Sequence, residues 1–204
     1  DFAAMGAMLR QAQAGYRQQE LLAILRTLPE YDKLHRVLDM GCATGLLGIA
    51  VIADKPERTG VLFDQLPAAL IEESIGQAGL EGRAEAVSGN FLTDDLGVGY
   101  DLILAVSVML FAKGRMDALL KKCYDALNPG GVMLVISEGI APDHTGPWDM
   151  TLGYLPYYMQ GMDMGVLKNE VSDAAAQVGF SCEKRTELLC SGWQDIDILR
   201  KIEK

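Results

Sequence analysis

Apolar residues follow two alternating patterns along most of the chain. Short runs rich in branched aliphatic residues, each closed by turn-forming or polar residues, predict buried strands. These runs cover residues 36–40, 60–64, 84–88, 101–108 and 132–138. Helical spacing appears in a stretch that starts at a Gly-rich turn after residue 40, in one that follows Pro67, and over residues 116–127. A leading amphipathic helix is expected over residues 16–28, where leucines share one face and Pro29 follows.

This alternation of strands and helices predicts an α/β fold. Near-continuous apolar strands joined by helices imply a parallel sheet covered on both faces, because right-handed crossovers leave few other arrangements. We therefore expect a doubly wound, mostly parallel sheet. After a helix over residues 168–178, residues 180–189 and 192–201 predict two strands with a short loop between them. Such strands are antiparallel to each other and would extend the sheet at one edge to seven strands.

Size and charge narrow the classes of function. With 204 residues, half of them hydrophobic, the chain is expected to form one domain around one core. Its longest uncharged stretch, residues 40–53, is shorter than the roughly 18 residues that cross a bilayer, so we expect a soluble protein without membrane anchor or signal peptide. The formal net charge of −10 argues against a nucleic-acid partner.

The cysteines argue for a reducing compartment. Four cysteines lie far apart in the sequence, without a CxxC pair and with only two histidines to assist them. A disulfide framework and a zinc site are therefore not expected, and no metal site is predicted. The cysteines are interpreted as small buried apolar residues, and the cytoplasm is the expected location.

The Gly-rich turn "DMGCATG" is the first candidate site. In open α/β sheets, ligands bind beyond the carboxyl ends of the strands, and this turn follows the first predicted strand. A dinucleotide fingerprint GxGxxG fails, because Gly41 is followed by Ala43 and Leu46 at the other two positions. This disfavours a nicotinamide-dependent oxidoreductase. The spacing that does occur is an acid, Asp39, ahead of small residues at every second position up to Gly45. Tight packing between strand and helix is the alternative explanation of the glycines.

Asp64 is the second candidate. It ends the second predicted strand, 25 residues after Asp39, which is about the spacing at which an acid meets ribose hydroxyls in nucleotide-binding α/β folds. Its two oxygens suit two vicinal hydroxyls, although a solvated strand end or a helix cap would also explain the residue.

These motifs resemble those of class I methyltransferases, which use S-adenosylmethionine. The turn resembles the nucleoside-binding turn of that family, with Ala43 where glycine is common, and "LLKKCYDALNPGGVMLVISE" resembles its helix, L-x-P-G-G turn and fifth strand. Within the family, the chain is most similar to small-molecule O-methyltransferases of the plant phenolic and bacterial polyketide-tailoring type. The resemblance implies a seven-stranded, Rossmann-like methyltransferase fold with an antiparallel C-terminal strand. The Pro-Gly-Gly element is expected to turn the helix into the strand.

The resemblance also implies a cosubstrate site. S-adenosylmethionine carries an ammonium, a carboxylate and a sulfonium, so an acid near the turn suits its cations, and small residues and a helix N-terminus suit its methionine part. After the third strand, Asn90 stands where the family often has an acid at the adenine amino group, and Phe91 could stack on the purine or belong to the core. The expected cosubstrate-binding residues are Asp39, Gly41, Cys42, Ala43, Gly45, Asp64, Gln65, Leu66, Gly89, Asn90, Phe91 and Ser107.

The resemblance begins near Phe2, where "FAAM" is similar to the linker helix of the O-methyltransferases, and runs nearly to the C-terminus. We therefore expect residues 1–30 to be a leading helical segment, the remnant of a linker to an absent N-terminal dimerisation domain, and residues 31–204 to form the methyltransferase domain. A homodimer is one expected state. Because the sequence opens at Asp1 rather than Met, it is interpreted as part of a longer or processed protein.

The catalytic residues are less well indicated. Leu110 occupies the position where O-methyltransferases often have a histidine base, and leucine cannot take a proton. His144, in the loop after the fifth predicted strand, is a weak candidate base, and an exposed loop histidine is the alternative. Residues 148–167 concentrate methionine, tryptophan and tyrosine, which would suit an acceptor pocket, a dimer surface or a part of the core.

The leading hypothesis is an enzyme, a transferase that moves a methyl group from S-adenosylmethionine to a small acceptor, on oxygen of an aromatic or polyketide-like compound, with S-adenosylhomocysteine as product. The alternative is a catalytically inactive module that binds S-adenosylmethionine or S-adenosylhomocysteine as a sensor or assembly partner, an idea motivated by Leu110. Turnover of acceptor compounds separates the two hypotheses.

Overall fold

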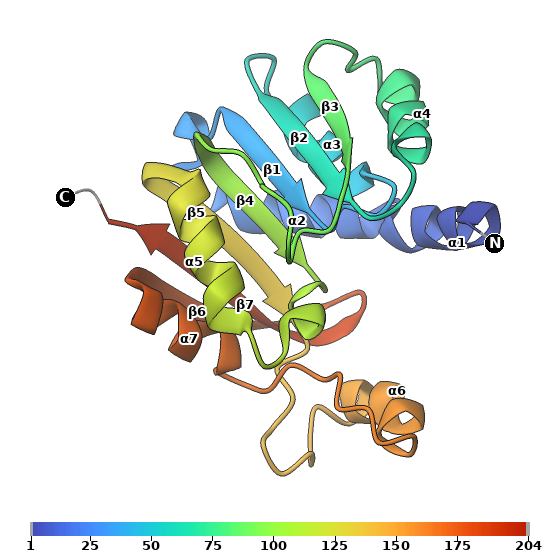
Figure 1. The fold of residues 1–204 in the computed structure, drawn as a ribbon, viewed down its shortest axis with the longest axis vertical. Helices are drawn as coiled ribbons and strands as arrows, with labels where there is room; N and C mark the ends of the chain where they lie inside the picture. The colour runs from blue at the N-terminus through green and yellow to red at the C-terminus, as the bar shows by residue number, and fades with distance from the viewer. Residues whose placement is uncertain (1, 203–204) are drawn as a thin grey trace.

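The computed structural model describes residues 2–202 and shows one seven-stranded sheet with the strand order β3-β2-β1-β4-β5-β7-β6. The strands are β1 (Arg36–Met40), β2 (Thr59–Asp64), β3 (Ala84–Ser88), β4 (Tyr100–Val106), β5 (Leu127–Ser137), β6 (Phe180–Leu189) and β7 (Gly192–Lys201). The first five strands are parallel, and β7 runs antiparallel to both β5 and β6 (Figure 1). The predicted fold class, including the antiparallel C-terminal hairpin, is confirmed.

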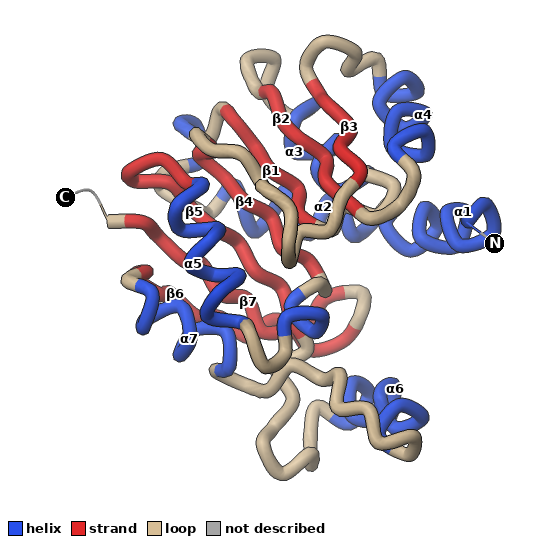
Figure 2. The backbone as a smooth tube through the Cα atoms, in the orientation of Figure 1, coloured by secondary structure: helices blue, strands red, loops and turns tan. Residues whose placement is uncertain are grey.

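Helices cover both faces of this sheet (Figure 2). They are α1 (Phe2–Gln13), α2 (Tyr16–Arg26), α3 (Leu46–Ala53), α4 (Ala68–Ala78), α5 (Met116–Ala126), α6 (Trp148–Tyr158) and α7 (Glu170–Val178). Apolar residues of α5 and α7 belong to the core on one face, and those of α2, α3 and α4 belong to the core on the other. The strand order reverses between β1 and β4, which makes the carboxyl edge at these two strands the expected ligand site.

Strand β1 shows how the sequence fills both cores. Successive side chains of a strand point to opposite faces, so Val37 enters the core with α2 and α3, whereas Leu38 and Met40 enter the core with α5. All three side chains are buried. Asp39 shares the face of Val37 and therefore points toward α3, behind the loop that follows the strand.

The boundary between α5 and β5 differs from the expectation. The helix ends at Ala126, and the Pro-Gly-Gly residues lie inside the first part of β5 instead of between the two elements. Residues 128–131 are looped out of the ladder, because Tyr100 pairs with Leu127 and Leu102 already pairs with Val132. Gly130 has a φ of 75°, which glycine adopts at little cost.

Helix α6 was not predicted as a helix. None of its side chains is buried, so its apolar residues give no core stripe from which the helical period could be read. In Figure 1 it lies apart from the two helical layers, beyond the carboxyl end of β5. The leading helical segment is present as α1 and α2, while Asp1 lies outside the described residues.

Candidate functional site

The loop after β1 is held by hydrogen bonds from its own backbone. The N–H groups of Gly41 and Cys42 both donate to the Phe63 carbonyl of β2, at 2.8 and 3.1 Å, and Gly45 N–H donates to the Cys42 carbonyl at 2.8 Å. Helix α3 then begins at Leu46. The backbone therefore turns sharply at the carboxyl edge of the sheet and exposes the loop to the space beyond it.

Two features require glycine at position 41: its left-handed backbone and the closeness of the Val108 side chain. Its φ is 73°, and a Cβ atom added there would lie 2.4 Å from Val108 Cγ1. Any side chain would push the loop away from the segment that follows β4. The glycine thus lets the loops after β1 and β4 form one continuous wall.

Asp64 ties the loops after β1 and β2 together. Its Oδ2 accepts a hydrogen bond from Ala43 N–H at 2.7 Å, and its Oδ1 accepts one from Leu66 N–H at 3.0 Å. A carboxylate has about four acceptor positions, so both oxygens retain capacity for a ligand. The side chain is half-buried at the end of β2, where hydroxyl groups of a ligand could reach it.

A cleft of about 550 Å³ opens at this edge of the sheet. Its walls come from α1, the start of α2 and the loops after β1, β2, β3 and β4. The lining residues are Leu9, Ala12, Gln13, Arg17, Gly41, Ala43, Leu47, Asp64, Gln65, Leu66, Phe91, Val106, Ser107, Val108 and Phe111. The set is mostly apolar, and its two charged members are Arg17 and Asp64.

The structure brings seven of the sequence-predicted site residues to this cleft. They are Gly41, Ala43, Asp64, Gln65, Leu66, Phe91 and Ser107. Phe91 is buried and meets Phe111 edge to face, with ring centroids 6.5 Å apart, so the two rings form an apolar corner of the cleft.

The other five predicted residues lie outside the cleft lining. Asp39 and Cys42 are buried behind the loop, and Asp39 Oδ2 accepts a hydrogen bond from Gly48 N–H of α3 at 2.8 Å. Gly45 precedes α3, and Gly89 N–H donates to the Asp64 carbonyl at 2.8 Å. Asn90 Oδ1 accepts from Leu92 N–H at 3.0 Å, so this oxygen stabilises its own turn. These residues support the cleft wall from behind.

Burial changes the acid–base behaviour of the groups behind the loop. Desolvation raises the pKa of Asp39 to about 7, with a smaller contribution from the nearby charge of Asp64, while the Gly48 hydrogen bond opposes the shift. Desolvation likewise raises the pKa of the Cys42 thiol, which keeps it neutral. Neither group is placed to act on a ligand directly.

The sequence reasoning missed the contribution of the leading helices. Gln13 of α1 is buried, its Nε2 donates to the Cys42 carbonyl at 3.0 Å, and its Oε1 accepts from Thr44 Oγ1 at 3.2 Å. Leu9, Ala12 and Arg17 complete this wall. Helical periodicity predicts that a helix exists but carries no signal for where it docks, so these residues could not be found from the pattern.

Arg17 brings a positive charge to the cleft. Among residues 6–202, whose side chains the structure describes, its guanidinium makes no hydrogen bond or ion pair. The side chain is half-buried. A guanidinium in this setting is suited to a ligand carboxylate, which it can bind through two parallel hydrogen bonds.

Neither Leu110, at the position of the family's base, nor the candidate base His144 lines the cleft. Leu110 is half-buried in a short 3-10 helix (Met109–Ala112) and packs against the core. His144 is exposed, and its ring lies edge to face on Tyr158 at 5.1 Å between centroids. Ser107 is the one hydroxyl-bearing residue among those that line the cleft.

The methionine- and aromatic-rich segment forms α6 and the loop after it. It contributes no residue to the cleft lining, and several of its large apolar side chains are exposed, including Trp148 at 72% and Met159 at 80%. After α6, Val166 is buried in the core. The core interpretation of residues 148–167 is therefore wrong for α6. The pocket interpretation does not hold for this cleft.

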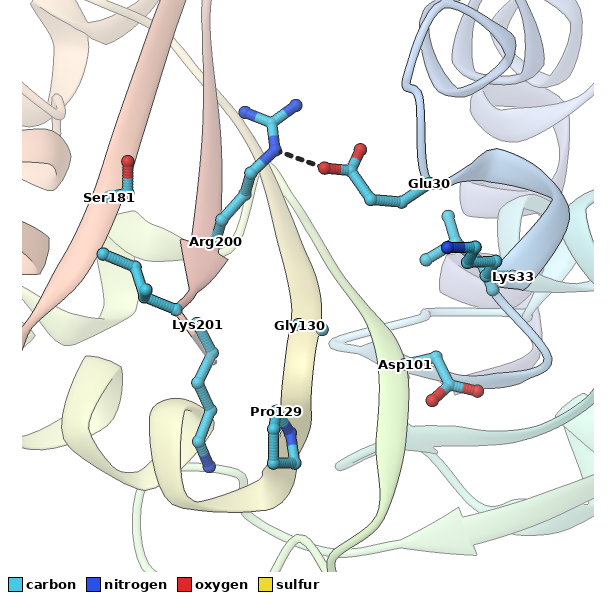
Figure 3. Close-up of a pocket in the computed structure, with 11 residues that line it drawn as sticks. Glu30, Lys33, Asp101, Pro129, Gly130, Ser181, Arg200 and Lys201 are labelled. Carbon is cyan, nitrogen blue, oxygen red and sulfur yellow. Dashed lines mark hydrogen bonds and ion pairs between the residues drawn. The ribbon is translucent and has the colours of Figure 1, made fainter. Parts of the chain in front are cut away.

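A second cavity of about 530 Å³ lies at the opposite, amino edge of the parallel strands (Figure 3). Two of its three cations are engaged in structural contacts: Arg200 Nε donates to Glu30 at 2.7 Å, and Lys201 Nζ donates to the carbonyls of Tyr124 and Leu127. These pairs fasten the segment after α2 and the end of α5 to β7. The third cation, Lys33, is exposed. Size alone does not separate the two cavities, but the position relative to the strands favours the cleft at the carboxyl edge.

The described part of the chain shows neither a metal-binding cluster nor a membrane-spanning helix. Residues 2–202 include no group of three or more His, Cys, Asp or Glu side chains placed to hold a metal ion. No helix in the same range has the length and apolar character that a membrane crossing requires.

Comparison with known proteins finds small-molecule methyltransferases among the relatives of this chain. The family described as "Methyltransferase domain" matches residues 38–133. Phenazine O-methyltransferase PhzM of Lysobacter antibioticus is 28% identical over 187 residues, which are 87% of this chain and 52% of that protein. The chain therefore spans about half the length of this curated relative.

Solved structures give the same picture at the level of the fold. An O-methyltransferase family protein from Burkholderia thailandensis superposes with a TM-score of 0.81 at 16% identity, covering 99% of this chain and 60% of that one. Human N-acetylserotonin methyltransferase in complex with SAM gives 0.75 at 20% identity, covering 97% and 55%. Both comparisons agree with the resemblance that the sequence motifs predicted.

Ala43→Gly should stabilise the loop. Ala43 has a φ of 52°, in the left-handed region that costs a residue with a Cβ about 1 kcal/mol, and glycine removes that strain. The net gain, after the added freedom of the unfolded chain, should appear as a higher urea midpoint with an unchanged m-value. Ala23→Gly, at an exposed position in the interior of α2, is the control and should be destabilising. A midpoint that falls in both variants would contradict the strain argument.

Asp39→Asn should remove a pH dependence of stability. Because the folded-state pKa of Asp39 is raised from 3.8 to about 7, the folded protein binds more protons than the unfolded chain in this interval, and stability falls as pH rises through it. Asparagine can still accept from Gly48 N–H but does not titrate. Urea unfolding at a series of pH values should give a shallower decline for the variant. Asp117→Asn, on the exposed face of α5, should leave the decline as in the original chain.

Proposed function

We propose that this chain, in which residues 38–133 match the family described as "Methyltransferase domain", binds S-adenosylmethionine in the cleft at the carboxyl edge of β1, β2 and β4 and transfers its methyl group to a small-molecule acceptor. The acceptor atom is an oxygen of an aromatic or polyketide-like compound. The observation that carries the proposal is the pairing of Asp64 with the small-residue loop after β1. On one wall of the cleft, the Asp64 carboxylate therefore keeps acceptor positions for a ligand, and the small residues of the loop let a ligand come close to the backbone.

The residues of the cleft fit the chemical parts of this cosubstrate. Asp64 offers acceptor positions for the ribose hydroxyls, and the buried ring of Phe91 offers a face for adenine. Gly41 and Ala43 leave space for the methionine part, and Arg17 provides a cation for its carboxylate. The two charged residues of the lining thus match two polar parts of the cosubstrate, Asp64 the ribose and Arg17 the carboxylate of the methionine part.

Asp39 has an indirect role in this scheme. Its carboxylate lies behind the loop, and a bound ammonium or sulfonium in front would favour its ionised form through a low-dielectric medium. Asp39 also holds the first turn of α3 through Gly48 N–H. It therefore contributes to the site by fixing the loop and by its charge.

Methyl transfer makes modest demands on the protein. When bound, S-adenosylmethionine supplies the electrophilic methyl carbon and the sulfonium leaving group. The chain holds the acceptor in line with that carbon and excludes water, which accounts for a large part of the acceleration in such displacements. Since Leu110 cannot take a proton, the acceptor should bring its own nucleophilicity, as an ionised phenol does. Ser107, at the cleft, is placed to orient an acceptor hydroxyl.

We also propose the acceptor class, the location and the assembly of this protein. The name of the relative from Lysobacter antibioticus, a phenazine O-methyltransferase, supports a flat aromatic acceptor for this chain. Cys42 and Cys123 are buried, whereas Cys182 is half-buried and Cys190 is exposed, so the prediction of a small buried residue is wrong for Cys190. All four thiols are free, which is compatible with the reducing cytoplasm that we propose as the location. We expect no nucleic-acid or membrane partner, and we expect a homodimer as the assembly.

Calorimetry tests the cosubstrate, and turnover tests the reaction. S-adenosylmethionine and S-adenosylhomocysteine should bind with micromolar affinity (about −8 kcal/mol), and NAD should not bind. A panel of phenols, amines and thiols, assayed for S-adenosylhomocysteine release, should then identify the acceptor class. Tight cosubstrate binding without turnover of any compound would contradict an enzyme, and NAD binding alone would contradict the whole assignment.

Substitutions at the two ends of the cleft should weaken cosubstrate binding separately. Asp64→Ala removes the ribose acceptor and the Ala43 contact and should cost about 1–3 kcal/mol of binding free energy. Arg17→Gln should raise the dissociation constant about tenfold, since a half-exposed charged hydrogen bond contributes roughly 1.4 kcal/mol. Arg115→Gln, an exposed arginine before α5, is the control. An unchanged constant for adenosine with Arg17→Gln is also expected, because adenosine has no carboxylate.

A further inference from the structure

The exposed apolar side chains of this molecule are concentrated in one segment. Among the described residues, thirteen large apolar side chains are exposed, and six of them lie within residues 148–162, on α6 and the turn after it. They are Trp148, Leu152, Leu155, Tyr157, Met159 and Met162. Single exposed apolar residues are normal, whereas a contiguous group of this kind marks an interaction surface.

Four of these side chains form one stripe along α6. Trp148, Leu152, Leu155 and Met159 follow one another at intervals of four, three and four residues, and this spacing places them on one face of a helix. Met159, the first residue after α6, keeps helical backbone angles, so it belongs to the same face. We call these four side chains the α6 stripe. Such spacing is the pattern by which one helix packs against another.

The α6 stripe faces away from the rest of the described chain. The contacts of α6 with the sheet lie on another side of the helix, where Tyr154 OH donates to Glu138 Oε1 at 2.8 Å. On that side Met150 Sδ also accepts from Gln194 Nε2 of β7 at 3.6 Å. Figure 1 shows α6 apart from the two helical layers. Most of the stripe is therefore in contact with solvent in a single copy of residues 2–202.

The area of the stripe is large enough for a specific dimer. Large apolar side chains bury roughly 150–250 Å² each when they are fully covered. With exposed fractions of 45–80%, the four side chains of two copies would bury about 1,000 Å² in total. This is about the area that a specific protein–protein interface requires, and the exposed Gly153 and Pro156 beside the stripe would add to it.

The distribution of charge favours a second copy at this place. The chain has a net charge of −10, so two copies repel each other over much of their surfaces. Residues 146–162 contain one charged residue, Asp149. A Cβ atom added at Gly192 of β7 would clash with Asp149 Oδ2, so this carboxylate is turned toward the β6–β7 hairpin and away from the stripe. Two copies can therefore meet at the stripe without opposing like charges.

The order of residues in the stripe suits an antiparallel pair. Intervals of four, three and four residues are the same in both chain directions, so an antiparallel copy sets Leu152 opposite Leu155 and Trp148 opposite Met159. A methionine sulfur packs favourably against an aromatic ring. The two helix dipoles also oppose each other in this arrangement.

We propose that α6 packs antiparallel against α6 of a second copy of this chain, about a twofold axis between Leu152 and Leu155, so that the two stripes cover each other. This interface belongs to the homodimer that we propose above. It does not depend on the proposed methyl transfer, because α6 contributes no residue to the cleft.

The molar mass in solution tests the interface. Sedimentation equilibrium at about 10 µM should give twice the mass of one chain. Leu152→Asp should raise the dissociation constant at least about a hundredfold, because each dimer would bury two unpaired charges. Val98→Asp, at an exposed apolar position between β3 and β4, is the matched control and should stay dimeric. An original chain that is monomeric up to about 100 µM would overturn the inference.

A second variant separates burial from repulsion between the acidic chains. Leu152→Lys lowers the net negative charge and should dissociate the dimer nevertheless, so a dimer that survives this substitution would overturn the inference. Both variants should keep the circular dichroism spectrum and the affinity for S-adenosylhomocysteine of the original chain, since position 152 is exposed and lies outside the cleft lining. Failure of the original chain to bind S-adenosylhomocysteine would contradict the proposed function and would leave the mass measurement valid.

Disulfide cross-linking tests the orientation. In a Cys190→Ser background, which removes the exposed native cysteine, Trp148→Cys should form a disulfide with Met159→Cys when the two variants are mixed. Neither variant should form a disulfide with itself, because equal positions of an antiparallel pair lie about 16 Å apart along the helix axis. Disulfides formed by each variant alone would contradict the antiparallel arrangement.

Discussion

The contact between Asp64 and Ala43 N–H is the constraint on which the cleft depends. It joins the ends of two neighbouring parallel strands, and it fixes the loop after β1 at a residue whose backbone is in the left-handed region. Without this carboxylate, nothing among the described residues would pair with that N–H, and the loop could relax away from β2. The Asp64 side chain therefore shapes the wall of the cleft and also keeps hydrogen-bond acceptor positions that point into it. The structural role of Asp64 and the ligand-binding role that we propose for it coincide in one side chain.

Close packing behind the loop serves the same end. A Cβ atom added at Gly48 would lie 2.8 Å from Asp39 Oδ2 and 2.5 Å from a Leu62 methyl group, so α3 lies directly against β1 and β2. This contact lets Asp39 reach the Gly48 N–H inside the helix and keeps a buried carboxylate paired. The side of the loop that faces the sheet and α3 is fully packed, and the side that faces the cleft is open to a ligand.

Most of the fold was accessible from the sequence, and the site was accessible in part. Strands β1 to β5 and the C-terminal hairpin follow from local apolar periodicity, and Asp64 follows from its position at the end of a strand. Gln13 and Arg17 were missed because the docking of α1 and α2 is a long-range contact that no local pattern records. Asn90 Oδ1 accepts a hydrogen bond within its own turn, and only coordinates reveal such a local contact, while the contact of Asn90 with adenine stays a prediction. The exposure of α6 was equally hidden, since Met, Trp and Tyr are used in cores, pockets and surfaces alike.

Gln13 gives the leading helices a thermodynamic link to the cleft. Its amide bonds the loop after β1 through both Nε2 and Oε1, so the docked state of α1 and the ordered state of that loop stabilise each other. If docked α1 strengthens the binding of a molecule to the loop, then that molecule strengthens the docking of α1 by the same free energy. Amide hydrogen exchange in α1 should therefore slow when a ligand occupies the cleft. The first helix of the chain is in this way coupled thermodynamically to ligand binding.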